Sequence, residues 1–92
     1  MPSVTLTPHL YRYFPQLEQQ PLRVAPGSVA EIVAALDAIA PGFSDYLLDD
    51  QGGLRRHVNV AINDTILIDR KSLADRVPEG GTLYIFQALT GG

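Results

Sequence analysis

A single amphipathic helix pattern, in a chain of only 92 residues, constrains the fold more than any other feature of the sequence. Ser28 stands at an N-cap position and Glu31 follows three residues later, which is the pattern of a capping box. Behind this start, apolar residues recur with the spacing of one helix face: Val29, Ile32, Val33, Leu36 and Ile39. Pro41-Gly42 predicts the end of the helix, because glycine readily adopts the left-handed conformation found there. A helix with one apolar face must bury it, so the remaining segments have to supply a second layer.

Short segments with the alternation typical of β-strands lie on both sides of this helix. We expect strands at 4–10 and 22–24 before it, joined by a wide turn over 11–20, and at 58–62, 65–68 and 82–87 after it. Asn63-Asp64 predicts a hairpin turn, residues 43–48 a helical turn against the core, and Leu73 an apolar anchor in the polar segment 69–78. This order resembles that of ubiquitin-like β-grasp domains. It predicts an α+β fold in which a mixed sheet of four or five strands packs on one main helix.

Composition narrows the functions open to such a domain. The chain has no cysteine, which excludes disulfides, thiolate metal sites and cysteine nucleophiles. Its net charge of −3 argues against nucleic-acid binding, which needs a positive field. The longest apolar run, 32–36, is far shorter than the roughly 20 residues of a membrane span, and no secretory signal pattern is visible. We therefore expect a cytoplasmic protein that binds neither nucleic acid nor membranes.

No side-chain constellation in the sequence supports catalysis or a metal site. His9 and His57 are the only imidazoles, and we interpret both as solvated or loosely capping residues. The acidic residues at 45, 49 and 50 do not match the spacing of a calcium loop. Arg55-Arg56-His57 is the one basic cluster in an acidic chain. It is either a solvated entry to the strand at 58 or a contact for an acidic patch on a partner.

The end of the sequence, Leu89-Thr90-Gly91-Gly92, directly follows the last expected strand. Residues 88–92 can extend about 16–18 Å, far enough to enter the active site of another protein. Glycines lack a Cβ and can pass through a narrow channel. A terminal carboxyl is ionised at neutral pH and can attack the α-phosphate of ATP. We therefore expect a folded domain over residues 1–87 and a flexible Gly-Gly tail over 88–92.

The order of elements and this ending together resemble the MoaD/ThiS family of ubiquitin-like sulfur carriers. Further points of similarity are the helix opening at 28–31, Pro41-Gly42, the segment 55–60 and the tail from Phe86. The resemblance implies a protein cosubstrate rather than an enzyme, although the chain could also be the small subunit of a synthase. No cofactor is implied on the carrier itself.

In such a carrier, an adenylating enzyme of the ubiquitin-activating type would use ATP to activate Gly92, with Gly91 giving access to its narrow channel. A sulfur donor would then form a thiocarboxylate, and the sulfur would pass to a biosynthetic acceptor enzyme. The acceptor pathway stays open between cysteine, a thio-metabolite, tRNA and molybdopterin. Two other functions also stay open: a modifier conjugated to lysines through Gly92, and a non-covalent β-grasp interaction module. Trimming of residues beyond Gly92 and the oligomeric state are likewise open.

Alternation along the last strand predicts where a partner docks. If Leu83 and Ile85 face the core, Tyr84 and Phe86 face outward, because neighbouring strand residues point to opposite sides. Exposed aromatics beside a tail would form an apolar docking patch. The reverse arrangement, with both aromatics inward, is the alternative. The predicted partner-binding residues are Tyr84, Phe86, Leu89, Arg55 and Arg56.

Overall fold

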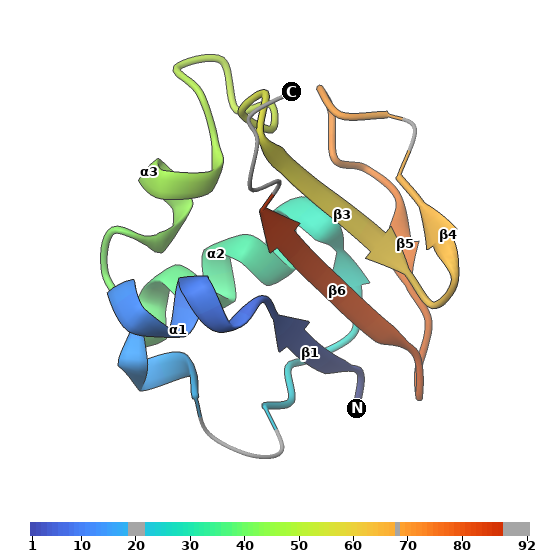
Figure 1. Ribbon diagram of the computed structural model, residues 1–92. Coiled ribbons are helices and arrows are strands. Elements are labelled where there is room, and N and C mark those ends of the chain that lie inside the picture. The colour runs from blue at the N-terminus through green and yellow to red at the C-terminus, as the bar shows by residue number, and fades with distance from the viewer. Residues whose placement is uncertain (19–21, 68, 88–92) are drawn as a thin grey trace.

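The fold places one main helix behind a mixed sheet (Figure 1). The computed structural model describes residues 1–18, 22–67 and 69–87. In chain order the elements are β1 (Ser3–Leu6), α1 (Pro8–Tyr13), the 3-10 turn η1 (Pro15–Leu17), β2 (Gly27–Ser28), α2 (Val29–Ile39), α3 (Phe43–Leu47), β3 (Val58–Ile62), β4 (Thr65–Ile66), β5 (Arg76–Val77) and β6 (Thr82–Gln87).

The main sheet has four strands in the order β1-β6-β3-β4. Strand β1 is parallel to β6, whereas β6 and β4 are both antiparallel to β3. Strands β2 and β5 pair separately as a short antiparallel ladder. This confirms the expected α+β arrangement of a mixed four-stranded sheet on one main helix. Within the described residues, no helix combines the length and apolar character needed to cross a membrane.

Helix α2 begins and ends where the sequence predicts. The Ser28 hydroxyl accepts from the Glu31 amide at 3.1 Å, and the Glu31 carboxylate accepts from the Ser28 amide at 2.8 Å. Gly42 has a φ of 99°, the left-handed value expected after the helix. The expectation that Ile39 belongs to the buried face was wrong, since Ile39 is exposed and Ala40 is buried instead. At 3.6 residues per turn, position 40 lies closer to the centre of the apolar face than position 39 does.

The N-terminal region departs most from expectation. The predicted strand over 4–10 ends at Leu6, and Pro8–Tyr13 forms helix α1 where the strand end and the wide turn were expected. Pro8 explains the switch, because proline has a helical φ and no N–H to leave unpaired at the first helical position. His9 therefore lies on a helix rather than at a strand end. The strand expected at 22–24 is reduced to one bridge between Arg23 and Ser3.

The core lies between the inner face of the sheet and the helices. Helix α3 contributes Phe43 and Leu47, both fully buried, as the pattern over 43–48 predicts. The hairpin at Asn63-Asp64 and the buried anchor Leu73 are also confirmed. Inward residues of β1, β3 and β6 join the apolar face of α2 in one cluster: Val4, Leu6, Val58, Val60, Leu83 and Ile85. One face of the sheet therefore packs against the core, and the other face lies on the outside of the domain.

Candidate functional site

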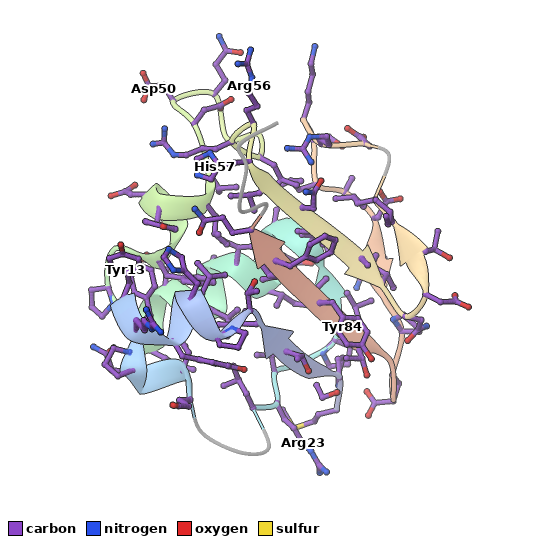
Figure 2. All side chains as sticks on the ribbon, in the orientation of Figure 1. Tyr13, Arg23, Asp50, Arg56, His57 and Tyr84 are labelled. Atoms are coloured by element: carbon purple, nitrogen blue, oxygen red, sulfur yellow. The ribbon has the colours of Figure 1, made fainter. Side chains whose placement is uncertain are left out.

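The two faces of β6 differ as the alternation predicts. Leu83 and Ile85 are fully buried, whereas 41% of Tyr84 is exposed and Phe86 is half-buried. This confirms that Tyr84 and Phe86 face outward. Figure 2 shows Tyr84 on the side of the sheet that faces the viewer, opposite helix α2 in Figure 1.

The outward side of the sheet, here called the outer face, carries an apolar row across the strands. Tyr84 lies in register between Thr5 of β1 and Ala61 of β3, and Ala61 pairs in turn with Ile66 of β4. Ile66 is 60% exposed, and Phe86 lies in the next row. The side chains that β1, β6 and β3 place on this face are all uncharged: Ser3, Thr5, Thr82, Tyr84, Phe86, Asn59 and Ala61. An exposed and partly aromatic surface, to which these three strands contribute no charge, suits protein docking.

Strand β6 ends at Gln87, the last residue that the structure describes. Its backbone N–H donates to Oγ1 of Thr7 at 3.1 Å, and its side-chain oxygen accepts from the Tyr46 hydroxyl at 3.1 Å. Three predicted site residues, Leu89, Gly91 and Gly92, lie outside the described residues. Their roles stay predictions, as does the division into a domain over 1–87 and a tail over 88–92.

The basic cluster lies at the same end of the sheet as Gln87, because Gln87 pairs with Val58, the first residue of β3. The Arg55 guanidinium donates to the Asp45 carbonyl through Nε at 3.2 Å and Nη2 at 3.0 Å, so it supports helix α3. The Arg56 side chain is exposed and has no hydrogen bond within the described part of the chain. Figure 2 shows it pointing away from the sheet. Of the two predicted partner contacts, Arg56 is therefore the one whose guanidinium is open to a partner.

A third arginine joins this end of the sheet and escaped the sequence analysis. The Arg70 guanidinium donates to Oδ1 of Asn59 at 3.1 Å and to the Arg55 carbonyl at 2.7 Å. It thus ties the polar segment after β4 to the start of β3. No sequence signal points to this residue, because the segment around it has no apolar periodicity and its partners lie 11 and 15 positions away.

Three carboxylates have a lowered pKa, and all three accept hydrogen bonds at turns or helix starts. The pKa of Asp37 is lowered mainly by the Ser44 backbone N–H. The pKa of Glu31 is lowered mainly by the Ser28 backbone N–H, and that of Asp69 by the Ser72 hydroxyl. Among the described residues, no group of three potential ligands could hold a metal ion.

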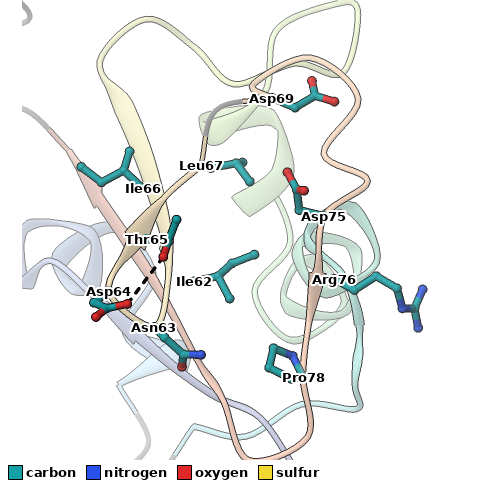
Figure 3. A pocket seen from close by; sticks show the side chains of 10 residues that line it. All are labelled: Ile62, Asn63, Asp64, Thr65, Ile66, Leu67, Asp69, Asp75, Arg76 and Pro78. Carbon is teal, nitrogen blue, oxygen red and sulfur yellow. Dashed lines mark hydrogen bonds between the residues drawn. The ribbon is translucent and has the colours of Figure 1, made fainter.

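A cavity of about 490 Å³ lies between the β3–β4 hairpin and β5 (Figure 3). Ile62 and Leu67 line it from the hairpin, and Asp75 and Pro78 from the β5 side. Neither histidine is among the described residues that line it. Because Ile62 is the last residue of β3 and Gln87 pairs with the first, this cavity lies away from the exit of the tail.

The chain is similar to a known protein family in sequence and to several solved structures in fold. The family model described as the ThiS family matches residues 10–92. A chain in the crystal structure of the Amycolatopsis orientalis BexX/CysO complex is 24% identical, with a TM-score of 0.83 over 100% of both chains. Mycobacterium tuberculosis CysO, described as an antigen, is 23% identical, with a TM-score of 0.80 over 97% of this chain and 100% of its own.

SAMP1 from Haloferax volcanii is 22% identical, with a TM-score of 0.74 over 99% of this chain and 98% of its own. At these identities the structural likeness shows the fold, which is the ubiquitin-like β-grasp. No curated protein sequence matches the chain significantly.

Proposed function

The chain belongs to the ThiS family, and we propose from this that it is a sulfur carrier whose terminal Gly92 becomes a thiocarboxylate. The observation that carries the proposal is the extent of the family match, which runs to residue 92 and so includes Gly91-Gly92. The domain in front of this ending supplies a fold and a docking face, whereas the reactive group is the terminal carboxyl. The carrier is thus the protein cosubstrate of partner enzymes, and ATP is the substrate of the activating partner. We place this chemistry in the cytoplasm.

The proposed reaction has two steps. A carboxylate oxygen of Gly92 attacks the α-phosphorus of ATP, pyrophosphate leaves, and an acyl-adenylate forms. Hydrosulfide supplied by a sulfur donor then attacks the carbonyl carbon, AMP leaves with the bridging oxygen, and loss of the sulfur-bound proton gives the thiocarboxylate. Gly91 contributes by its lack of a side chain, which allows close passage through the channel of the adenylating enzyme. The thiocarboxylate then donates its sulfur to an acceptor enzyme.

The outer face of the sheet is the proposed docking surface for the adenylating enzyme. Tyr84 and Phe86 supply exposed aromatic area on the last strand before residues 88–92. Leu89 is the further apolar residue that we assign to this interface from the sequence. Arg56 supplies a cation at the rim, and Arg55 contributes mainly by supporting helix α3 through its bonds to the Asp45 carbonyl. Aromatic residues and arginine are the residue types that most often dominate binding energy in interfaces.

Incubation with a ubiquitin-activating-type enzyme from the same organism, ATP and a sulfide source tests the proposal. Intact-mass analysis should show one oxygen of the chain replaced by sulfur. A variant lacking Gly92 should release no pyrophosphate and gain no sulfur, while Tyr11→Phe, a change outside the proposed docking residues, should react normally. Failure of the full chain to form either adenylate or thiocarboxylate would refute the proposal. Covalent adducts on lysines of other proteins would instead identify a modifier, and an unchanged cellular phenotype without Gly91-Gly92 would identify a non-covalent module.

A further inference from the structure

Two side chains distant in sequence, those of Thr7 and Tyr46, form hydrogen bonds with Gln87, the last residue of β6. Strand β1 ends at Leu6, whose register partner is Ile85, so β1 offers no further backbone partner to Gln87. Thr7 fills this place with its hydroxyl, which donates to the Ile85 carbonyl at 3.3 Å and accepts from the Gln87 N–H at 3.1 Å. The hydroxyl therefore extends the ladder beyond the end of the strand.

The second contact comes from helix α3. The Tyr46 hydroxyl donates to the side-chain oxygen of Gln87 at 3.1 Å. The Tyr46 ring is itself fixed, because it packs against Tyr13 and Phe14 with ring centroids 5.5 and 5.6 Å away. Phe14 in turn packs edge-on against the fully buried Phe43 at 5.2 Å. The hydroxyl is thus presented by a ring that the core holds in place.

Both contacts act where the domain ends and residues 88–92 begin. A hydrogen bond to the backbone of Gln87 fixes the strand end, and one to its side chain adds a second point of attachment. Fixing both restricts the directions in which the chain can continue from the sheet. When the residue that precedes a short segment is fixed, the segment has fewer conformations to lose. Less conformational entropy is then lost when the end of the segment enters a binding channel.

We infer that Thr7 and Tyr46 are positioning residues, which hold Gln87 and thereby direct residues 88–92 toward the adenylating enzyme. The inference rests on the proposed function, because it concerns how Gly92 is presented for activation. The side-chain hydrogen bonds of both residues end at Ile85 and Gln87, so we assign neither of them a part in the chemistry at Gly92. Their loss should therefore raise KM for the carrier and leave kcat unchanged, since the reactive complex is the same once formed.

Two pairs of variants test this. Tyr46→Phe removes the hydroxyl that binds Gln87 and keeps the ring. Tyr11→Phe is its matched control, because the Tyr11 hydroxyl accepts from the Leu6 N–H at 3.1 Å and forms no hydrogen bond with Gln87. Thr7→Val removes the bridging hydroxyl at nearly constant shape, and Thr7→Ser retains it.

With the adenylating enzyme that activates the wild-type chain, pyrophosphate release should show KM raised about 3- to 10-fold in Tyr46→Phe and Thr7→Val. Tyr11→Phe and Thr7→Ser should stay within about twofold of wild type at unchanged kcat. Equal KM values in Tyr46→Phe and Tyr11→Phe would overturn the inference, and so would a loss confined to kcat.

Amide hydrogen exchange tests the contact without any partner. Exchange of the Gln87 N–H should become about 3- to 10-fold faster in Thr7→Val than in Thr7→Ser, relative to the core amide of Val60. Unchanged exchange would overturn the inference even if adenylation proceeds. If exchange responds as expected while no enzyme adenylates the wild-type chain, the proposed function fails and the attachment of Gln87 stands.

Discussion

The two faces of β6 are formed by alternate residues of one strand, and they differ in how deeply those residues are buried. On the inner face, Leu83 and Ile85 are fully buried in the core with the apolar side of α2. On the outer face, Tyr84 leaves 41% of its surface exposed, and its neighbour in register, Ala61, pairs with the still more exposed Ile66. Folding requires apolar residues on the inner face. It does not require them on the outer face, so apolar residues there point to binding.

The largest effect should follow a change on the inner face. Ile85 lies in register with Leu6 on one side and Val60 on the other, with no exposed surface. Ile85→Ala leaves a cavity among these neighbours and should lower the free energy of unfolding by about 2–5 kcal/mol. Urea denaturation monitored by circular dichroism measures this. A loss below about 1 kcal/mol would show that the core repacks around the smaller side chain. The inner face would then contribute less to stability than its burial suggests.

A change on the outer face should affect binding more than folding. Tyr84→Ala should alter the free energy of unfolding by less than about 1 kcal/mol, since the side chain is already partly hydrated. It should raise KM of the adenylating enzyme for the carrier by about tenfold or more, the usual cost of removing a central interface aromatic. Thr5→Ala, in the same row on β1, removes no aromatic area and should change KM little. An unchanged KM in Tyr84→Ala would place the docking surface elsewhere.

The elements that were predicted correctly are those whose signals are local. Helix α2 is fixed by Ser28 and Glu31 at its start and by Gly42 after its end, all within a few residues of the helix itself. Strand β6 (Thr82–Gln87) follows the turn cluster at 79–81 and is rich in aromatic and β-branched residues. Both patterns reflect backbone geometry and burial, which act over short separations.

The features that escaped prediction depend on tertiary contacts. The ladder of Gly27–Ser28 with Arg76–Val77 joins segments about 50 positions apart and only two residues long. Thr7 and Tyr46 lie 80 and 41 positions from Gln87, so no sequence pattern links them to it. Helix α1 differs in this respect, because its signal is local: alternation at residues 4–6 predicts a strand, whereas Pro8 starts a helix two residues later.

Acid should weaken the layer behind the sheet. Asp37, at the junction of α2 and α3, accepts from the Gly42 and Ser44 N–H groups at 3.1 and 3.0 Å, which lowers its pKa below the ordinary 3.8. A lowered pKa stabilises the folded state at every pH above the ordinary value, and this contribution is lost as pH falls through the lowered one. The Tm should therefore fall as the pH decreases from 5 to 2.

Thermal unfolding of wild type and Asp37→Ala over this range measures the contribution. The variant should begin with a lower Tm at pH 5 and should lose less of it on acidification. Parallel curves would assign the acid response to Glu31 and Asp69 instead, whose pKa values are also lowered. The outward residues of β1, β6 and β3 include no carboxylate. Acid should therefore lower the stability through the helical layer and leave the charge of these outward side chains unchanged.

The smallest effect is expected at the edge of the outer face, where Ile66 is 60% exposed on β4. Ile66→Thr keeps a β-branched side chain suited to the strand, so the free energy of unfolding should change by no more than about 0.5 kcal/mol. If the docking surface is centred on β6, Ile66 lies at its rim and KM should rise only about two- to threefold. A rise as large as that of Tyr84→Ala would move the centre of the surface toward β4. The apolar row from Tyr84 to Ile66 would then act as one continuous binding surface, and the contrast between the two faces would extend across the sheet rather than along β6 alone.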